Sequence, residues 1–178
     1  MKYEEYLSCA KKHLDGCYSL FRNYQPNPLT DGYVWLEIFY LSGYIIEGIT
    51  VYSAYKLNGW PRNVDIKKPN LAFTQRTGLD FYYKRDNNDP YYQTRNYMDL
   101  SVQGHRYKEI VERLLKPNPS FYGIPYFGDG EIDINIKSLF DKWCPEVRYT
   151  YNEKQFDLNQ TIVNKLIITC SQIYNKHI

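Results

Sequence analysis

The 178-residue chain has little of what most metal sites and disulfide frameworks require. It contains four cysteines, none of them in a CxxC pair, and only three histidines, at positions 13, 105 and 177. This spacing does not match the ligand pattern of a zinc site. We therefore expect no metal, no cofactor and buried, unpaired thiols, as is usual in a reducing compartment such as the cytoplasm.

The signatures of several large enzyme classes are also missing. The sequence has no GxxxxGK[ST], GxGxxG, HExxH or GxSxG motif, which argues against a P-loop, a dinucleotide fold, a zincin and an α/β-hydrolase. Its 22 Lys and Arg nearly balance its 20 acidic residues, giving a net charge of +2. That balance is too even to indicate nucleic-acid binding through bulk charge. No catalytic residue is predicted.

Membrane signals are weak as well. The first 14 residues are amphipathic and carry acids, unlike a secretory signal or a lipidation motif. Residues 38–55 form an apolar run in which Glu47 is the only charged residue. A carboxylate near mid-span costs about 2.5 kcal/mol or more on insertion. We therefore expect a buried helix of a soluble protein and no membrane partner.

Aromatic residues are abundant, with 20 Tyr, 8 Phe and 3 Trp, and apolar spacing of three and four residues recurs along the chain. The spacing predicts helices over about 3–24, 31–57, 99–116, 132–143 and 158–178. Expected helix ends include an N-cap at Asp31, a stop at 58–61, a cap at Asp133 and a capping box formed by Asp157 and Gln160.

Five helices without a β–α–β alternation predict an all-α fold. We expect an up-down helical bundle of about five helices in a single domain, 1–178. Residues 62–98 lack sustained periodicity and are predicted to form a long irregular insertion between the second and third helices.

Four segments, in order, resemble HEPN domains, the helical bundles named for higher-eukaryote and prokaryote nucleotide binding. They are YLSGYIIE at 40–47, Lys56 a few turns on, GHRY at 104–107 and WCPEVRY at 143–149. The resemblance covers about 110 residues. It implies a HEPN-like bundle that forms a homodimer and takes a nucleotidyltransferase-type protein as partner in a toxin–antitoxin or stress module, with nucleotide binding as a family property.

HEPN ribonucleases carry an Arg followed by four to six residues and a His, and no arginine of this chain has that spacing. The nearest pair, Arg95 and His105, has nine residues between its members. The family's lysine one turn after the glutamate is also replaced, here by Val51. The resemblance therefore implies a binding or regulatory protein rather than an enzyme.

Gly43 and Glu47 are the most informative pair on the second expected helix. Gly43 lets another helix approach closely, and Glu47 follows one turn later on the same face. A carboxylate in so apolar a stretch needs a partner or a proton, and Arg148 is the first choice, His105 the second. Two interpretations stay open: a ligand pocket, or a buried Glu–Arg pair that fixes the last helix. The pocket would comprise Tyr44, Glu47, Lys56, His105, Arg148 and Tyr149.

The alternative function is RNA binding or cleavage through residues 62–107. Basic residues alternate there with tyrosines and phenylalanines, a combination suited to single-stranded RNA, although five aspartates between 65 and 99 dilute the charge. The expected RNA contacts are Lys84, Arg85 and Arg95.

Overall fold

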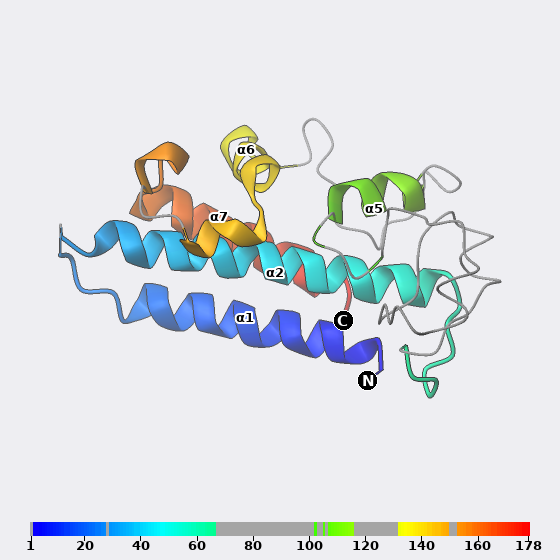
Figure 1. Ribbon diagram of the computed structural model, residues 1–178. Coiled ribbons are helices and arrows are strands. Elements are labelled where there is room, and N and C mark those ends of the chain that lie inside the picture. Colours follow the sequence, from blue (N-terminus) through cyan, green and yellow to red (C-terminus); the bar gives the residue numbers. More distant parts are fainter. Residues whose placement is uncertain are drawn as a thin grey trace. The chain divides into compact units, whose positions relative to one another are not determined.

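The computed structural model describes residues 2–27, 29–66, 102, 105, 107–115, 132–149 and 153–178. Over these residues the fold is all-α, with no strand (Figure 1). The α-helices are α1 (Glu4–Arg22), α2 (Asp31–Leu57), α5 (Tyr107–Leu115), α6 (Ile134–Lys142) and α7 (Gln160–Asn175), and the 3-10 helices are η1 (Pro145–Tyr149) and η2 (Glu153–Phe156). The all-α prediction is thus confirmed for the described residues. The expected insertion lies outside them from residue 67 to 98.

Contacts divide the chain into two compact units. Unit 1 comprises Met1–Leu7 and Thr50–Ile124, and unit 2 comprises Ser8–Ile49 and Pro125–Ile178. The division falls within α1 and α2, each of which contributes residues to both units.

The core of unit 1 is built around the end of α2. Tyr55 is fully buried there, and the Tyr3 ring stacks on it with the centroids 6.1 Å apart. Beyond Leu57 the helix ends as the sequence predicts, because Gly59 adopts a φ of 71°. The amide of Trp60 donates to the Tyr55 carbonyl, and its indole packs edge-on against the Tyr55 ring at 5.2 Å. This is a Schellman motif with its hydrophobic contact.

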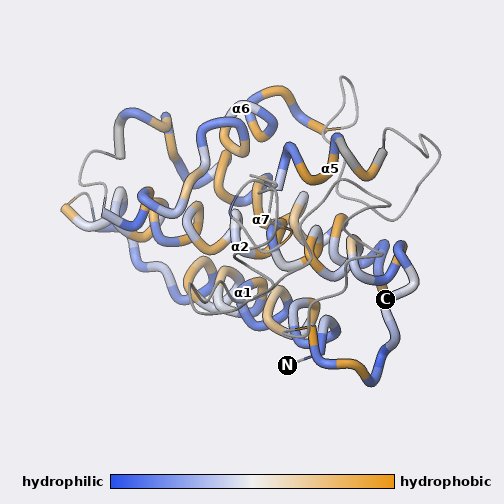
Figure 2. The backbone as a smooth tube through the Cα atoms, turned by 45° about the vertical axis from the view of Figure 1, so that its right-hand side comes forward, coloured by the Kyte–Doolittle hydropathy of each residue, from blue (hydrophilic) through white to orange (hydrophobic). Residues whose placement is uncertain are grey.

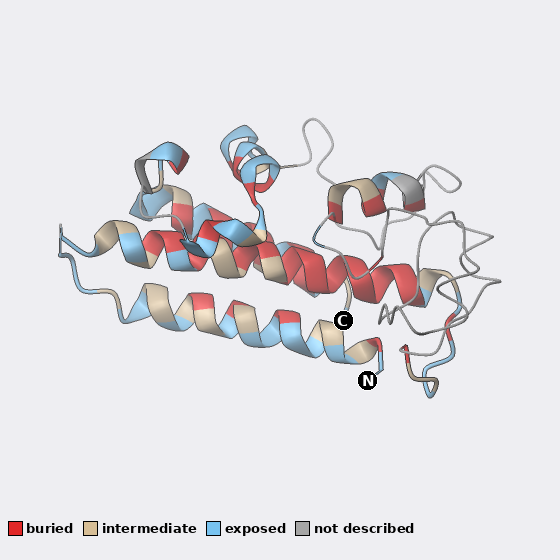
Figure 3. Ribbon diagram, in the orientation of Figure 1, coloured by how far each residue is buried: buried red, intermediate tan, exposed pale blue. Residues whose placement is uncertain are grey.

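In unit 2, α1 and α2 run antiparallel to each other (Figure 1). The α1 helix alternates between hydrophobic and hydrophilic residues along its length (Figure 2), and its buried stripe is Ala10, Leu14 and Cys17. Nearly the whole middle of α2 is buried (Figure 3). By length and composition α2 could cross a membrane. Its most apolar window of 18 residues has a mean hydropathy of 1.3, but 72% of that window is buried. The predicted buried helix is what the structure shows.

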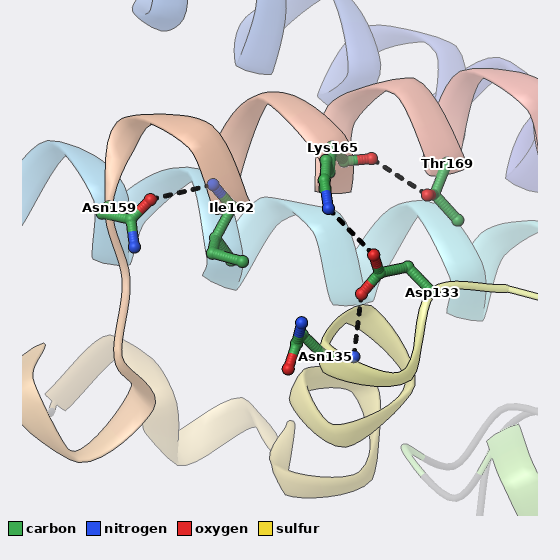
Figure 4. A network of polar contacts seen from close by, with 6 residues as sticks. All are labelled: Asp133, Asn135, Asn159, Ile162, Lys165 and Thr169. Carbon is green, nitrogen blue, oxygen red and sulfur yellow. Dashed lines mark hydrogen bonds and ion pairs between the residues drawn. The ribbon is translucent and has the colours of Figure 1, made fainter.

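The α6 and α7 helices of unit 2 are joined through Asp133 (Figure 4). Its carboxylate caps α6 by accepting from the Asn135 amide at 2.9 Å, and it pairs with the Lys165 ammonium at 3.0 Å. The hydrogen bond from Lys165 and then that from the backbone lower the pKa of Asp133. The predicted cap is confirmed, and the same side chain also anchors α7.

The predicted capping box of the last helix is wrong. The N-cap of α7 is Asn159, whose side-chain oxygen accepts from the Ile162 amide at 3.0 Å (Figure 4). Asp157 instead adopts a φ of 51°, the left-handed conformation. A residue in that conformation turns the chain between η2 and α7, so the helix begins at Gln160, later than the spacing suggested.

Two buried cysteines meet the middle of α2 in unit 2. The Cys17 thiol of α1 donates to the Ile38 carbonyl at 3.8 Å, and the Cys170 thiol of α7 donates to the Ser42 carbonyl at 4.0 Å. The Ser42 hydroxyl itself donates to the Ile38 carbonyl at 2.7 Å. Small polar groups therefore link three helices while keeping their donors paired.

The expectation of buried thiols holds for Cys17 and Cys170, whereas Cys9 and Cys144 are exposed. We predict that an excess of a thiol reagent modifies two of the four cysteines rapidly in the folded protein and all four in denaturant. The variant Cys9→Ala should lower the number of rapidly modified cysteines by one, and Cys170→Ala should leave that number unchanged. Rapid modification of all four thiols under native conditions would contradict the described packing.

Candidate functional site

The most unusual contact of unit 2 is between Gly43 of α2 and Trp143, the residue after α6. A Cβ at Gly43 would lie 1.8 Å from the Cε2 atom of the Trp143 indole. The indole therefore lies directly on the helix backbone, where its N–H donates to the Tyr40 carbonyl at 3.1 Å. The prediction that Gly43 allows a close approach is confirmed, although an indole ring rather than a helix makes it.

Two tyrosines of α2 lie beside this indole. The Tyr44 ring packs edge-on against Trp143 at 5.2 Å and edge-on against Tyr40 at 5.0 Å. Seating the indole on Gly43 also fixes the start of η1, because Trp143 is followed after one residue by Pro145–Tyr149. The sequence WCPEVRY thus places Arg148 next to Tyr40 and Tyr44 of α2.

Arg148 lies on the surface among three tyrosines. Its guanidinium donates to the Tyr149 hydroxyl and lies 4.4 Å from the centroid of that ring. A hydrogen bond with the Tyr40 side chain, and after it the bond to Tyr149, raises the pKa of Arg148. Tyr149 is 64% exposed. The guanidinium is held by aromatic side chains while remaining accessible to solvent.

Glu47 is buried, with 8% of its surface exposed, one turn after Gly43. Both Glu47 and Arg148 act electrostatically on Tyr44. Burial and the hydrogen bond with Tyr40 raise the pKa of Tyr44 most, the charge of Glu47 raises it further, and the charge of Arg148 lowers it. The structure therefore brings Tyr44, Glu47, Arg148 and Tyr149 of the predicted pocket together, around Tyr44 and Trp143.

The other predicted pocket residues belong to unit 1. Lys56 is exposed, and its ammonium lies 5.1 Å from the centroid of the Tyr52 ring. His105 is exposed too. The residues expected to contact RNA, Lys84, Arg85 and Arg95, lie outside the described residues, whereas Arg62 at the start of that segment pairs with Glu4 at 2.5 Å.

Two members of the site were missed from the sequence. Tyr40 precedes Tyr44 by one helical turn, a spacing that signals contact on one face. His13 of α1 packs its ring against Tyr44 at 5.8 Å, with the Cys9 sulfur 3.4 Å from its Nε2 atom. Partial burial lowers the pKa of His13. Its sequence spacing gave no sign of this contact, since it depends on how α1 packs on α2.

The site offers hydrogen-bonding groups and aromatic rings. Tyr44 is neutral at ordinary pH because its pKa is raised, so it offers a hydroxyl rather than a nucleophile. Among the described residues no cluster of His, Cys, Asp and Glu could hold a metal ion. What the surface presents is a fixed guanidinium flanked by tyrosines, the residue types most enriched at binding hot spots.

Comparison with known proteins adds no family to this description. No family model matches the chain, and neither a curated protein nor a solved structure matches it.

Proposed function

We propose that this chain is a non-catalytic binding or regulatory protein with a HEPN-like helical architecture, and that Arg148 and Tyr149 form its recognition surface. The observation that carries the proposal is the exposed Arg148–Tyr149 pair, which is held in place by the seating of Trp143 on Gly43. A preorganised Arg and Tyr lose little conformational entropy on binding, so they suit a protein interface.

The resemblance to HEPN domains suggests two kinds of partner. One is a second copy of the chain, which gives a cytoplasmic homodimer, and the other is a nucleotidyltransferase-type protein. The position of Tyr44, Glu47 and Arg148 around the Gly43–Trp143 contact supports the proposal, because these residues lie in two of the four segments that carry the resemblance.

We predict that Arg148→Ala and Tyr149→Ala each weaken self-association at least about tenfold, the effect expected of an interface hot spot. Light scattering over a concentration series measures the dissociation constant. Both side chains are exposed, so the melting temperature should stay close to that of the parent protein.

Arg22→Ala is the matched control, because the Arg22 guanidinium also lies over a tyrosine, 5.3 Å from the Tyr18 centroid, at the end of α1. It should leave self-association unchanged. A parent protein that stays monomeric throughout the micromolar range would refute the homodimer. Cleavage of RNA by the purified protein would refute the non-catalytic assignment.

A further inference from the structure

A second surface of unit 2 has different chemistry. A groove of about 740 Å³ lies where the start of α2 meets the start of α7, and its lining includes Tyr24, Asp31, Trp35, Asp157 and Asn159. Its volume is within the range of pockets that accommodate small ligands or single side chains of a partner.

The charge of this groove is negative. Asp31 and Asp157 are its ionisable acids, and no Lys, Arg or His appears among the described residues that line it. The Asp31 carboxylate accepts from the Asn27 amide at 2.7 Å and from the Tyr24 hydroxyl. A carboxylate has about four acceptor sites, so capacity remains for a further donor. Within the described part of the chain the Asp157 carboxylate has no hydrogen bond or ion pair. The Asp157 backbone adopts a φ of 51°.

The wall of the groove is aromatic. The Tyr24 and Trp35 rings lie 4.4 Å apart at an angle of 49°. Partial burial, followed by the hydrogen bond to Asp31, raises the pKa of Tyr24, so its ring carries no charge at neutral pH. Trp35 is 95% buried, and the described residues provide no hydrogen-bond acceptor for its indole N–H. A group that enters the groove can satisfy this donor, since Trp35 lines the groove.

We infer that the groove binds an arginine side chain presented by an extended peptide segment of a partner protein. The guanidinium would pair with Asp31 and Asp157 and stack on Tyr24, since its planar fork matches carboxylates and its face matches an aromatic ring. A backbone carbonyl of the peptide would accept from the Trp35 indole. Leu29 and Tyr33, which flank Asp31 in the sequence, are 85% and 57% exposed, and they offer apolar contact area that a free small cation would not use.

An anion is the competing ligand, because two helices begin at the groove and each N-terminus carries about half a positive charge. The two carboxylates contribute two negative charges, which outweigh the helix ends. The net field therefore selects a cation.

The test is calorimetric titration of the full chain with a short Arg-containing peptide, with the same peptide carrying citrulline, with free arginine and with inorganic phosphate. We expect the Arg peptide to bind at least about tenfold more tightly than the citrulline peptide, and more tightly than free arginine. Asp157→Asn should weaken peptide binding about tenfold without unfolding the protein, because asparagine tolerates the left-handed conformation. Asp157→Gly should weaken it equally while relieving the strained φ.

The matched control is Glu37→Gln, which removes an exposed carboxylate from α2 outside the groove lining and should leave peptide binding unchanged. Equal affinity for the arginine and citrulline peptides would overturn the inference. So would binding of free arginine as tight as that of the peptide, or binding of phosphate by the parent protein that is tighter than that of the Arg peptide.

Discussion

Replacing Gly43 by alanine is expected to lower the free energy of unfolding by about 3 kcal/mol or more, the upper range for an overpacked site. The added Cβ would lie 1.8 Å from the Trp143 ring, and the atoms it meets belong to a rigid indole. Either the indole leaves the helix, breaking its hydrogen bond to Tyr40, or the α6–η1 segment shifts with it. Urea denaturation followed by circular dichroism measures the change in the free energy of unfolding.

The matched control is Gly16→Ala in α1. A Cβ there would meet only the Leu41 side chain at 3.7 Å, an ordinary contact. The free energy of unfolding of this variant should rise by up to about 1 kcal/mol, since alanine is a better helix former than glycine. The same alanine preference applies at Gly43 once the indole is gone.

Combining Gly43→Ala with Trp143→Ala tests whether contact with the indole causes the loss of stability. In the Trp143→Ala background, Gly43→Ala should become neutral or stabilising, whereas additive losses would show that the glycine is required for another reason. Trp143→Ala alone should lower the free energy of unfolding by about 3–5 kcal/mol, as truncation of a buried Trp does. It should also weaken self-association, since the Arg148–Tyr149 surface is held in place through this ring.

The second large effect is expected at alkaline pH. Burial raises the pKa of the Cys17 thiol from 9.0 to about 12, and it raises the pKa of Cys170 as well. Both thiols thus stay protonated in the folded protein while the unfolded chain loses these protons above about pH 9. The folded state binds more protons, so stability is full below that pH and falls as pH rises toward the folded pKa values.

Each buried thiol should reduce the free energy of unfolding by about 1.4 kcal/mol per pH unit above pH 9. The two together should therefore remove about 4 kcal/mol at about pH 10.5. Urea denaturation at a series of pH values gives this slope. Tyrosines ionise in the same range, since an ordinary phenol has a pKa of about 10, and the raised pKa values of Tyr3, Tyr24 and Tyr44 add to the slope with the same sign. The cysteine variants therefore isolate the part of the slope that the thiols contribute.

Cys170→Ala should lower the alkaline slope by about 1.4 kcal/mol per pH unit, the contribution of one thiol, although the small cavity it leaves lowers stability at every pH. Cys9→Ala is the control, because Cys9 is exposed and should not alter the slope. An unchanged slope in the double variant Cys17→Ala/Cys170→Ala would assign the alkaline instability to other groups.

The helices were predictable because their signals are local. Apolar spacing located α1, α2 and α6, and Gly59 and Asp133 located two helix ends, since a left-handed residue and a capping carboxylate act on adjacent backbone. The capping box at the last helix failed for a related reason. A spacing rule identifies two compatible side chains, but it does not specify the backbone conformation between them. Asp157 adopts the left-handed conformation, and Asn159 is the N-cap of the helix.

The candidate site was predictable only in part. Glu47, Tyr44 and Arg148 were identified because a charge in an apolar helix and a resemblance to a known motif are visible in sequence. His13 was not, because nothing within α1 distinguishes a histidine that packs on Tyr44 from one that faces solvent. The acidic groove was missed as well, since Asp31 and Asp157 are 126 positions apart.

The sequence by itself determined that this protein is helical, that α2 is its most buried helix and that a glycine and a glutamate on α2 are exceptional. Each of these properties follows from the spacing of residues a few positions apart. The tertiary structure decided what they contact: an indole on Gly43, thiols from α1 and α7 beside Ser42, and a guanidinium among tyrosines. Such contacts join residues up to 128 positions apart, and they arise only when side chains fill the space between packed helices.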